Sequence, residues 1–159
     1  MSRQRLVTLA VAALAMVLTA TGLWLVIDGS SRRDAERAGT DAVSAARGSI
    51  VAMGSYRPET ADKDLPAARE RLTGEFLDAY TQLIQTVVIP SAQQKRITSV
   101  VTVPAAAVVS AEPDRVVVLA FVDQTLTVGK EPPSANPARY RVTMEKVDGR
   151  WLIAGFDQI

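Results

Sequence analysis

Apolar residues are concentrated in one uninterrupted run near the N-terminus. Residues 6–27 (LVTLAVAALAMVLTATGLWLVI) contain no charged side chain. A helix of this length extends roughly 33 Å, which is enough to cross a hydrocarbon core of about 30 Å. Arg3 and Arg5 precede the run, and a basic N-terminal flank favours a cytoplasmic N-terminus. The pattern therefore predicts a cytoplasmic tail (1–5), a transmembrane helix (6–27) and an exported C-terminal portion, held at the plasma membrane as a single-pass protein.

A cleaved signal peptide is the alternative interpretation of this run. Signal peptides have shorter apolar cores, of about 7–15 residues, followed by a site of small residues. The stretch 20–22 (ATG) fits such a site, but the next five residues, LWLVI, continue the apolar run beyond it. This continuation favours an uncleaved anchor.

The next region is rich in alanine and carries mixed charges, a composition that favours a helix over residues 32–53. Its small residues recur every three or four positions and form one stripe: Ala35, Ala38, Ala42, Ala45 and Ala46. A stripe of small residues allows close packing, either within the molecule or against a helix of a partner. Residues 54–62 (GSYRPETAD) are expected to form a loop. Residues 28–64 are therefore predicted to be a helical stalk and loop.

A second helical segment is predicted over residues 65–89. Asp64 is its expected N-cap and Pro90 its expected end. Gly74 falls in its middle, where a glycine allows close approach of a neighbour or marks a bend. One apolar stripe runs along the segment: Leu72, Phe76, Ala79, Tyr80, Leu83 and Val87.

From residue 97 the apolar period changes to two, which predicts strands over 97–111, 115–128, 139–147 and 150–156. Pro104 indicates an edge strand or a bulge in the first strand. The second strand is apolar on both faces at its centre and is expected to be central and covered. The last two strands are joined by Asp148-Gly149, a two-residue hairpin turn that sets Met144 opposite Ile153. Residues 129–137 are expected to be a loop.

Helices followed by strands predict an α+β fold, in which the helices pack on one face of a curved antiparallel sheet of about four strands. Residues 65–159 form the remainder of the exported domain in this interpretation. The domain is near neutral, because residues 28–159 carry 16 basic and 17 acidic side chains. This balance argues against a nucleic-acid partner.

The chain has no His and no Cys. Disulfides, thiolate metal sites, Cys nucleophiles and His-dependent triads are therefore excluded. There is also no phosphate-binding glycine motif, and the sequence predicts neither a cofactor nor a metal.

One enzyme hypothesis remains. A cone-shaped pocket can hold an Asp that removes a proton beside a carbonyl and a Tyr that stabilises the oxyanion, as isomerases and dehydratases require. Asp123 is the candidate base, with Tyr56, Tyr80 and Tyr140 as candidate donors. The alternative is that Asp123 lies where its strand emerges into solvent.

The aromatic residues are expected either to pack in the core or to line a groove for a lipid or a partner. The candidate pocket or partner groove consists of Phe76, Tyr80, Phe121, Asp123, Tyr140 and Trp151.

In this order the residues resemble the mycobacterial and actinobacterial Mce-associated membrane proteins. The match spans the apolar N-terminal run, the Ala-rich segment and four short motifs: LTGEF (72–76), VIP (88–90), VDQT (122–125) and VDGRWL (147–152). The resemblance implies a fold like nuclear transport factor 2, similar to the periplasmic domains of some type IV secretion inner-membrane subunits.

The same resemblance implies a non-catalytic accessory role at the bilayer, in which the protein binds and stabilises Mce complexes, the lipid importers of the cell envelope. The partners would be transporter subunits or related accessory proteins. A lipid or steroid carried in the same cone is an alternative function.

Overall fold

The computed structural model of the protein describes residues 33–159. The predicted cytoplasmic tail and the predicted transmembrane segment, residues 6–27, lie outside the described residues. Within residues 33–159, no helix is both long and apolar enough to cross a membrane.

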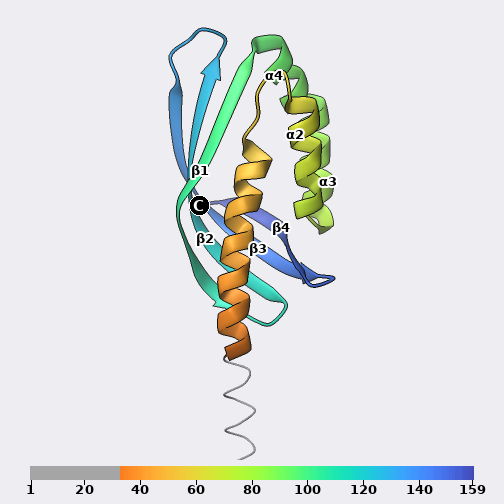
Figure 1. The fold of residues 1–159 in the computed structure, drawn as a ribbon, viewed down its shortest axis with the longest axis vertical. Helices are drawn as coiled ribbons and strands as arrows, with labels where there is room; N and C mark the ends of the chain where they lie inside the picture. The colour runs from red at the N-terminus through yellow and green to blue at the C-terminus, as the bar shows by residue number, and fades with distance from the viewer. Residues whose placement is uncertain (1–32) are drawn as a thin grey trace, which may run out of the picture.

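Helices and a four-stranded sheet make up the described chain. Residues 33–54 are helical and are called the long helix below. The remaining elements, in chain order, are α2 (Ala61–Ala67), a 3₁₀ turn (Ala68–Arg71), α3 (Gly74–Leu83), a π-helical turn (Ile84–Val88), α4 (Ile89–Lys95), β1 (Ile97–Ala111), β2 (Arg115–Val128), β3 (Ser134–Val147) and β4 (Arg150–Gln158). Figure 1 shows the long helix in orange to yellow, with α2 and α3 beside it and the strands behind and to the left. The predicted α+β fold is confirmed.

The strands form an antiparallel meander in the order β1-β2-β3-β4. β1 is an edge strand, and its register shifts between Thr102 and Ala105, around the proline that indicated an edge or a bulge. In the β3–β4 hairpin, Met144 lies opposite Ile153, as predicted. Asp148 and Gly149 both have positive φ angles, of 49° and 77°, which the tight turn requires.

β3 begins at Ser134, so the prediction of a loop over residues 129–137 was wrong in its second half. Long β2 pairs with this stretch, with Leu126 opposite Ser134 and Asp123 opposite Pro137. β4 joins the other side of β3 only from Tyr140 onward. Pro137 therefore lies where β3 is itself an edge, a position that tolerates the missing N–H.

The second helical segment is divided where a single helix was predicted over residues 65–89. α2 already begins at Ala61, so Asp64 lies inside it and is not the N-cap. The chain is extended at Leu72, and the next amide, of Thr73, donates a hydrogen bond of 2.9 Å to the carbonyl of Ile153. Gly74 then has a φ angle of +59° as the first residue of α3. This contact with β4 overrides a helical pattern that is continuous in the sequence.

The helix also continues past Pro90 to Lys95, so Pro90 does not end it. In a regular α-helix, the proline ring would collide with a carbonyl of the preceding turn. Here a π-helical turn precedes the proline, and the Ile89 N–H donates to the carbonyl of Ile84, five residues earlier. We attribute the tolerance of Pro90 to this wider turn.

The core lies between the helices and one face of the sheet. β2 contributes alternate residues Val116, Val118, Ala120 and Val122, and the long helix contributes Ala38, Ala42, Ala46 and Ile50. The alanine stripe therefore packs within the molecule, and contact of Ala38 or Ala42 with a partner helix is excluded by their burial. Ala35 and Ala45 are half-buried. From Ala38 to Ile50, one face of the predicted stalk is part of the domain core.

The opposite face of β2 differs from the expectation of a strand covered on both sides. Val117 and Leu119 are half-buried there, and Phe121 is 41% exposed. The apolar residues of this face do not mark a second core.

Candidate functional site

A cavity of about 700 Å³ opens between α3 and the helix-covered face of the sheet. Its size lies within the range of about 300–1,000 Å³ that is typical of small-molecule sites. The end of the long helix, α3 and all four strands contribute to it. The lining residues are Ile50, Met53, Gly54, Phe76, Ala79, Tyr80, Leu83, Val101, Val122, Gln124, Asn136, Pro137, Ala138, Tyr140, Phe156 and Gln158.

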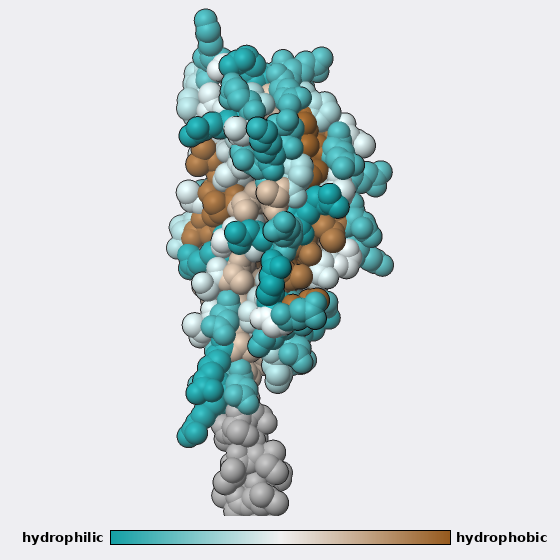
Figure 2. All heavy atoms as spheres, turned by 45° about the vertical axis from the view of Figure 1, so that its right-hand side comes forward, coloured by the Kyte–Doolittle hydropathy of each residue, from teal (hydrophilic) through white to brown (hydrophobic). Residues whose placement is uncertain are grey.

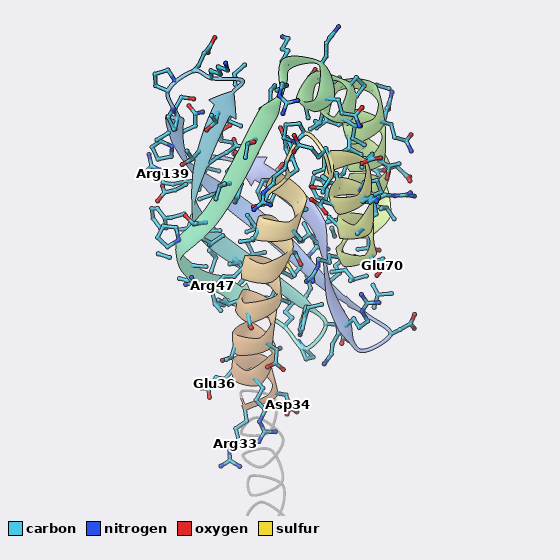
Figure 3. The ribbon with its side chains drawn as sticks, turned by 45° about the horizontal axis from the view of Figure 1, so that its top comes forward. Arg33, Asp34, Glu36, Arg47, Glu70 and Arg139 are labelled. Atoms are coloured by element: carbon cyan, nitrogen blue, oxygen red, sulfur yellow. The ribbon has the colours of Figure 1, made fainter. Side chains whose placement is uncertain are left out.

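No charged side chain is among the described residues that line this cavity. Exposed charged residues such as Glu70 and Arg139 lie at the periphery of the molecule instead (Figure 3). The lining consists of aliphatic, aromatic and amide groups. It therefore offers no carboxylate or ammonium group for acid–base chemistry and no counter-ion for a charged ligand.

Aromatic rings from three elements form one wall of the cavity. Tyr140 of β3 stacks on Phe156 of β4, with ring centroids 4.2 Å apart. Phe76 of α3 lies 6.0 Å from Phe156 and 6.4 Å from Tyr80. These contacts hold α3 against the end of the sheet and give the cavity a rigid apolar surface.

Tyr80 contributes its ring to the wall, but its hydroxyl is engaged elsewhere. Its single proton is shared between the carbonyl of Met53 at 3.1 Å and that of Leu65 at 3.2 Å. Burial raises the pKa of this phenol well above its usual value, because the charged form would lose its hydration. Tyr80 is therefore a neutral structural donor and is not free to stabilise an oxyanion.

Two amide side chains lie at one end of the cavity, and a third lies beside the aromatic wall. Gln124 of β2 is paired directly with Asn136 of β3. The Nε2 group of Gln124 donates a hydrogen bond of 3.0 Å to Oγ of Ser99, which is buried. Gln158, near the end of β4, lies opposite Tyr140. These groups can form hydrogen bonds with a ligand without adding charge.

Three of the six residues predicted for a pocket line the cavity: Phe76, Tyr80 and Tyr140. Trp151 is buried in the core instead, with the Nζ atom of Lys146 5.6 Å from its ring centroid. Within the described chain, its Nε1 atom has no hydrogen-bond partner. Phe121 is exposed on the other face of the sheet.

The interpretation of Asp123 as a pocket base was wrong. Successive side chains of a strand point to opposite faces, and Val122 lines the cavity. Asp123 therefore points away from the cavity, and it is exposed. This position removes the isomerase or dehydratase alternative, which required a carboxylate inside the cone beside a tyrosine.

The candidate pocket set omitted Phe156, which was expected with the other aromatic residues in the core or in a groove, and the amides of the cavity were not predicted. A usable signal was present in the hairpin, because Met144 was correctly set opposite Ile153, and both residues are buried. Counting back by two along β3 from Met144 leads to Tyr140, Ala138 and Asn136, all of which line the cavity. Across residues 33–159, no three His, Cys, Asp or Glu side chains lie close enough to hold a metal ion.

The family described as "Uncharacterized protein Rv1363c/MT1408-like" matches residues 4–157. The chain belongs to this family. A relative from Mycobacterium tuberculosis strain H37Rv, named "Outer membrane protein Rv1973", is 51% identical over 146 residues. That alignment covers 92% of this chain and 91% of the relative. Neither the family description nor the name of this relative assigns a catalytic activity.

Solved structures of similar fold include two from bacterial proteins. A periplasmic fragment of TraM is 14% identical, with a TM-score of 0.62 over 75% of this chain and 95% of the fragment. VirB8 of Agrobacterium tumefaciens is 18% identical, with a TM-score of 0.60 over 73% of this chain and 88% of its own. Likeness at this level of identity shows the fold alone. This chain therefore has a fold like that of VirB8 and nuclear transport factor 2, as the resemblance implied.

Proposed function

We propose that the protein is a membrane-anchored, non-catalytic accessory protein that binds and stabilises an Mce-type lipid import complex of the cell envelope. The observation that carries the proposal is the open, uncharged cavity. Its amides and apolar side chains can bind a partner or a ligand, but they offer no acidic or basic group for a reaction. The apolar run at residues 6–27 supplies the anchor.

The comparisons support a place in the envelope. The relative Rv1973 is named an outer membrane protein, and the TraM fragment of similar fold is periplasmic. For the present chain, the basic flank before the apolar run favours the plasma membrane, with the N-terminus in the cytoplasm. The folded domain, residues 33–159, then meets its partners outside the cytoplasm.

Cross-linking in intact membranes tests this proposal. The tagged full-length protein is cross-linked in its native host and purified under denaturing conditions, and the attached proteins are identified by mass spectrometry. We expect transporter subunits, or related accessory proteins, among them. Residues 1–32 fused to an unrelated exported domain serve as the control, which should capture none of these. Recovery of no transporter subunit by the full-length protein would count against the proposal.

A second candidate function is the carriage of a lipid or steroid in the cavity. The aromatic wall of Phe76, Tyr140 and Phe156 favours it, because such a surface suits a hydrocarbon chain or ring system. Native mass spectrometry of the detergent-extracted full-length protein checks this function. A bound lipid mass is expected, and a mass equal to that of the protein alone would speak against carriage.

A further inference from the structure

The polarity of the cavity changes from one end to the other along the strands. Gln124 and Asn136 form a directly paired row at the polar end. The next row towards the cavity interior is apolar, with Val122 opposite Ala138. Beyond it stand the stacked rings of Tyr140 and Phe156, with the exposed Gln158 opposite Tyr140 at the edge strand β4. A ligand that follows this gradient has a hydrocarbon body and one polar end.

The polar end is organised by neutral hydrogen bonds. Ser99, which is 1% exposed, holds the Nε2 group of Gln124 through its Oγ atom. The backbone of Ser99 is itself fixed, because its N–H and C=O groups pair with those of Tyr56 at 2.9 Å each. This arrangement leaves the carbonyl oxygen of the Gln124 amide to accept a hydrogen bond from a ligand. Asn136 offers a donor and an acceptor beside it.

We propose that the cavity selects a lipid whose polar group is uncharged, such as the hydroxyls and ester of an acylglycerol. The inference rests on the second candidate function, that the cavity holds a lipid. A hydroxyl or ester finds partners in the amides. Beside Gln124, which is half-buried, a carboxylate or phosphate gives up part of its hydration and finds no cation among the described lining residues, and a partly dehydrated charge without a partner is costly.

The mouth of the cavity provides a position where this selection can be changed. Figure 2 shows apolar surface in brown reaching the exterior among hydrophilic atoms in teal. Leu83 and Val87 are both exposed, by 51% and 52% respectively, and both lie in the continuous helical stretch from α3 to α4. Of these two, Leu83 lines the cavity and Val87 does not. A cation at position 83 would therefore give a charged lipid its missing partner, whereas a cation at position 87 would not.

Monoolein and oleate form the matched pair of probes, because they share one acyl chain and differ in the charge of the polar end. The full-length protein, in a neutral detergent, is mixed with equal amounts of both at a pH where oleate is ionised. Native mass spectrometry measures the ratio of the two bound masses. We expect monoolein to be favoured by about tenfold or more in the wild type. Leu83→Lys should lower or reverse this ratio, and Val87→Lys should leave it unchanged.

The possible results separately test the selection for an uncharged group, lipid carriage itself and the place of the selection in this cavity. Equal occupancy by both probes would overturn the selection for an uncharged group and leave lipid carriage standing. Binding of neither probe would contradict lipid carriage itself, and the inference with it. A wild-type preference that Leu83→Lys does not change would overturn the assignment of the selection to this cavity. Both lysine variants lie at exposed positions, where a new charge remains hydrated and the fold is retained.

Discussion

At the residue scale, Tyr80 of α3 links its own helix to the long helix and to α2. Its hydroxyl donates to a carbonyl at the end of the long helix and to another in α2, while its ring contacts Phe76 within α3. The residue is buried, and its two acceptors are the carbonyls of Met53 and Leu65. The side chain therefore fixes the helices whose surfaces form one side of the cavity.

Removal of this hydroxyl should destabilise the domain. Tyr80→Phe should lower the free energy of unfolding by about 1–2 kcal/mol, because the two carbonyls lose the one proton that they share while the ring is retained. Urea denaturation of the full-length protein in detergent, followed by circular dichroism, measures the change. Tyr140→Phe is the matched control, since no hydrogen bond of the Tyr140 hydroxyl is present among the described residues; its effect should stay below about 0.5 kcal/mol. Equal effects of the two variants would contradict the role given to the Tyr80 hydroxyl.

The raised pKa of Tyr80 also predicts a dependence of stability on pH. In the unfolded chain, a tyrosine loses its proton near pH 10, whereas the folded protein retains it to higher pH. Above about pH 10 the unfolded state thus binds fewer protons than the native state, and stability falls by up to about 1.4 kcal/mol per pH unit for this group. Below that pH the contribution is fully present. Urea denaturation at a series of alkaline pH values should show a smaller decline for Tyr80→Phe, and identical declines would exclude Tyr80 as the cause.

At the scale of elements, the long helix packs against β1 through Arg47 and at Gly54. Arg47 of the helix donates a hydrogen bond of 2.6 Å to the carbonyl of Val103, where the register of β1 shifts (Figure 3). The helix approaches the strand closely at Gly54. A Cβ atom placed on Gly54 would lie only 2.6 Å from Cγ2 of Val101, which is buried. The missing side chain thus permits the approach.

Two glycines of the long helix should therefore respond oppositely to alanine. Gly54→Ala should destabilise the domain by about 1–3 kcal/mol, because the buried branched side chain of Val101 has to move. Gly48→Ala should be neutral or stabilising by up to about 1 kcal/mol, because its new methyl group meets the nearest atom at an ordinary 3.6 Å and alanine favours a helix. Thermal unfolding of both variants measures the difference. A loss at Gly48 as large as that at Gly54 would show that the close approach is not the cause.

The local sequence pattern predicts some of these elements and not others. The strands and the hairpin register were predictable, because the Asp148-Gly149 turn and the apolar alternation agree on one pairing. The break at Leu72 was not, because it depends on a contact with Ile153, far along the chain. The π-helical turn before Pro90 was likewise hidden, since the apolar stripe continues through it.

At the scale of the whole molecule, the cavity is assembled from the long helix, α3 and four strands. Phe76, Tyr80 and Tyr140 were within reach of sequence reasoning, because apolar periodicity marks the inner face of a helix or strand. Asp123 was misplaced because β2 is apolar on both faces at its centre, so its pattern does not reveal which face is inside. Only the packing of the helices on Val116, Val118, Ala120 and Val122 decides this.

The same packing forms the cavity on which the proposed function rests. The apolar run at residues 6–27 precedes a domain whose cavity lining is uncharged in the part of the chain that the structure describes. We propose that such a domain acts by binding. The proposed partner is an Mce-type lipid import complex of the envelope, which the protein would stabilise.

The most direct test of this claim is the amount of assembled import complex in membranes from the native host with and without the protein. Complexes are extracted in mild detergent, separated by native electrophoresis and quantified by mass spectrometry of their subunits. We predict that deletion lowers the assembled complex severalfold and that expression of the full-length protein restores it. An unchanged amount of assembled complex after deletion would contradict the proposal that the protein stabilises it.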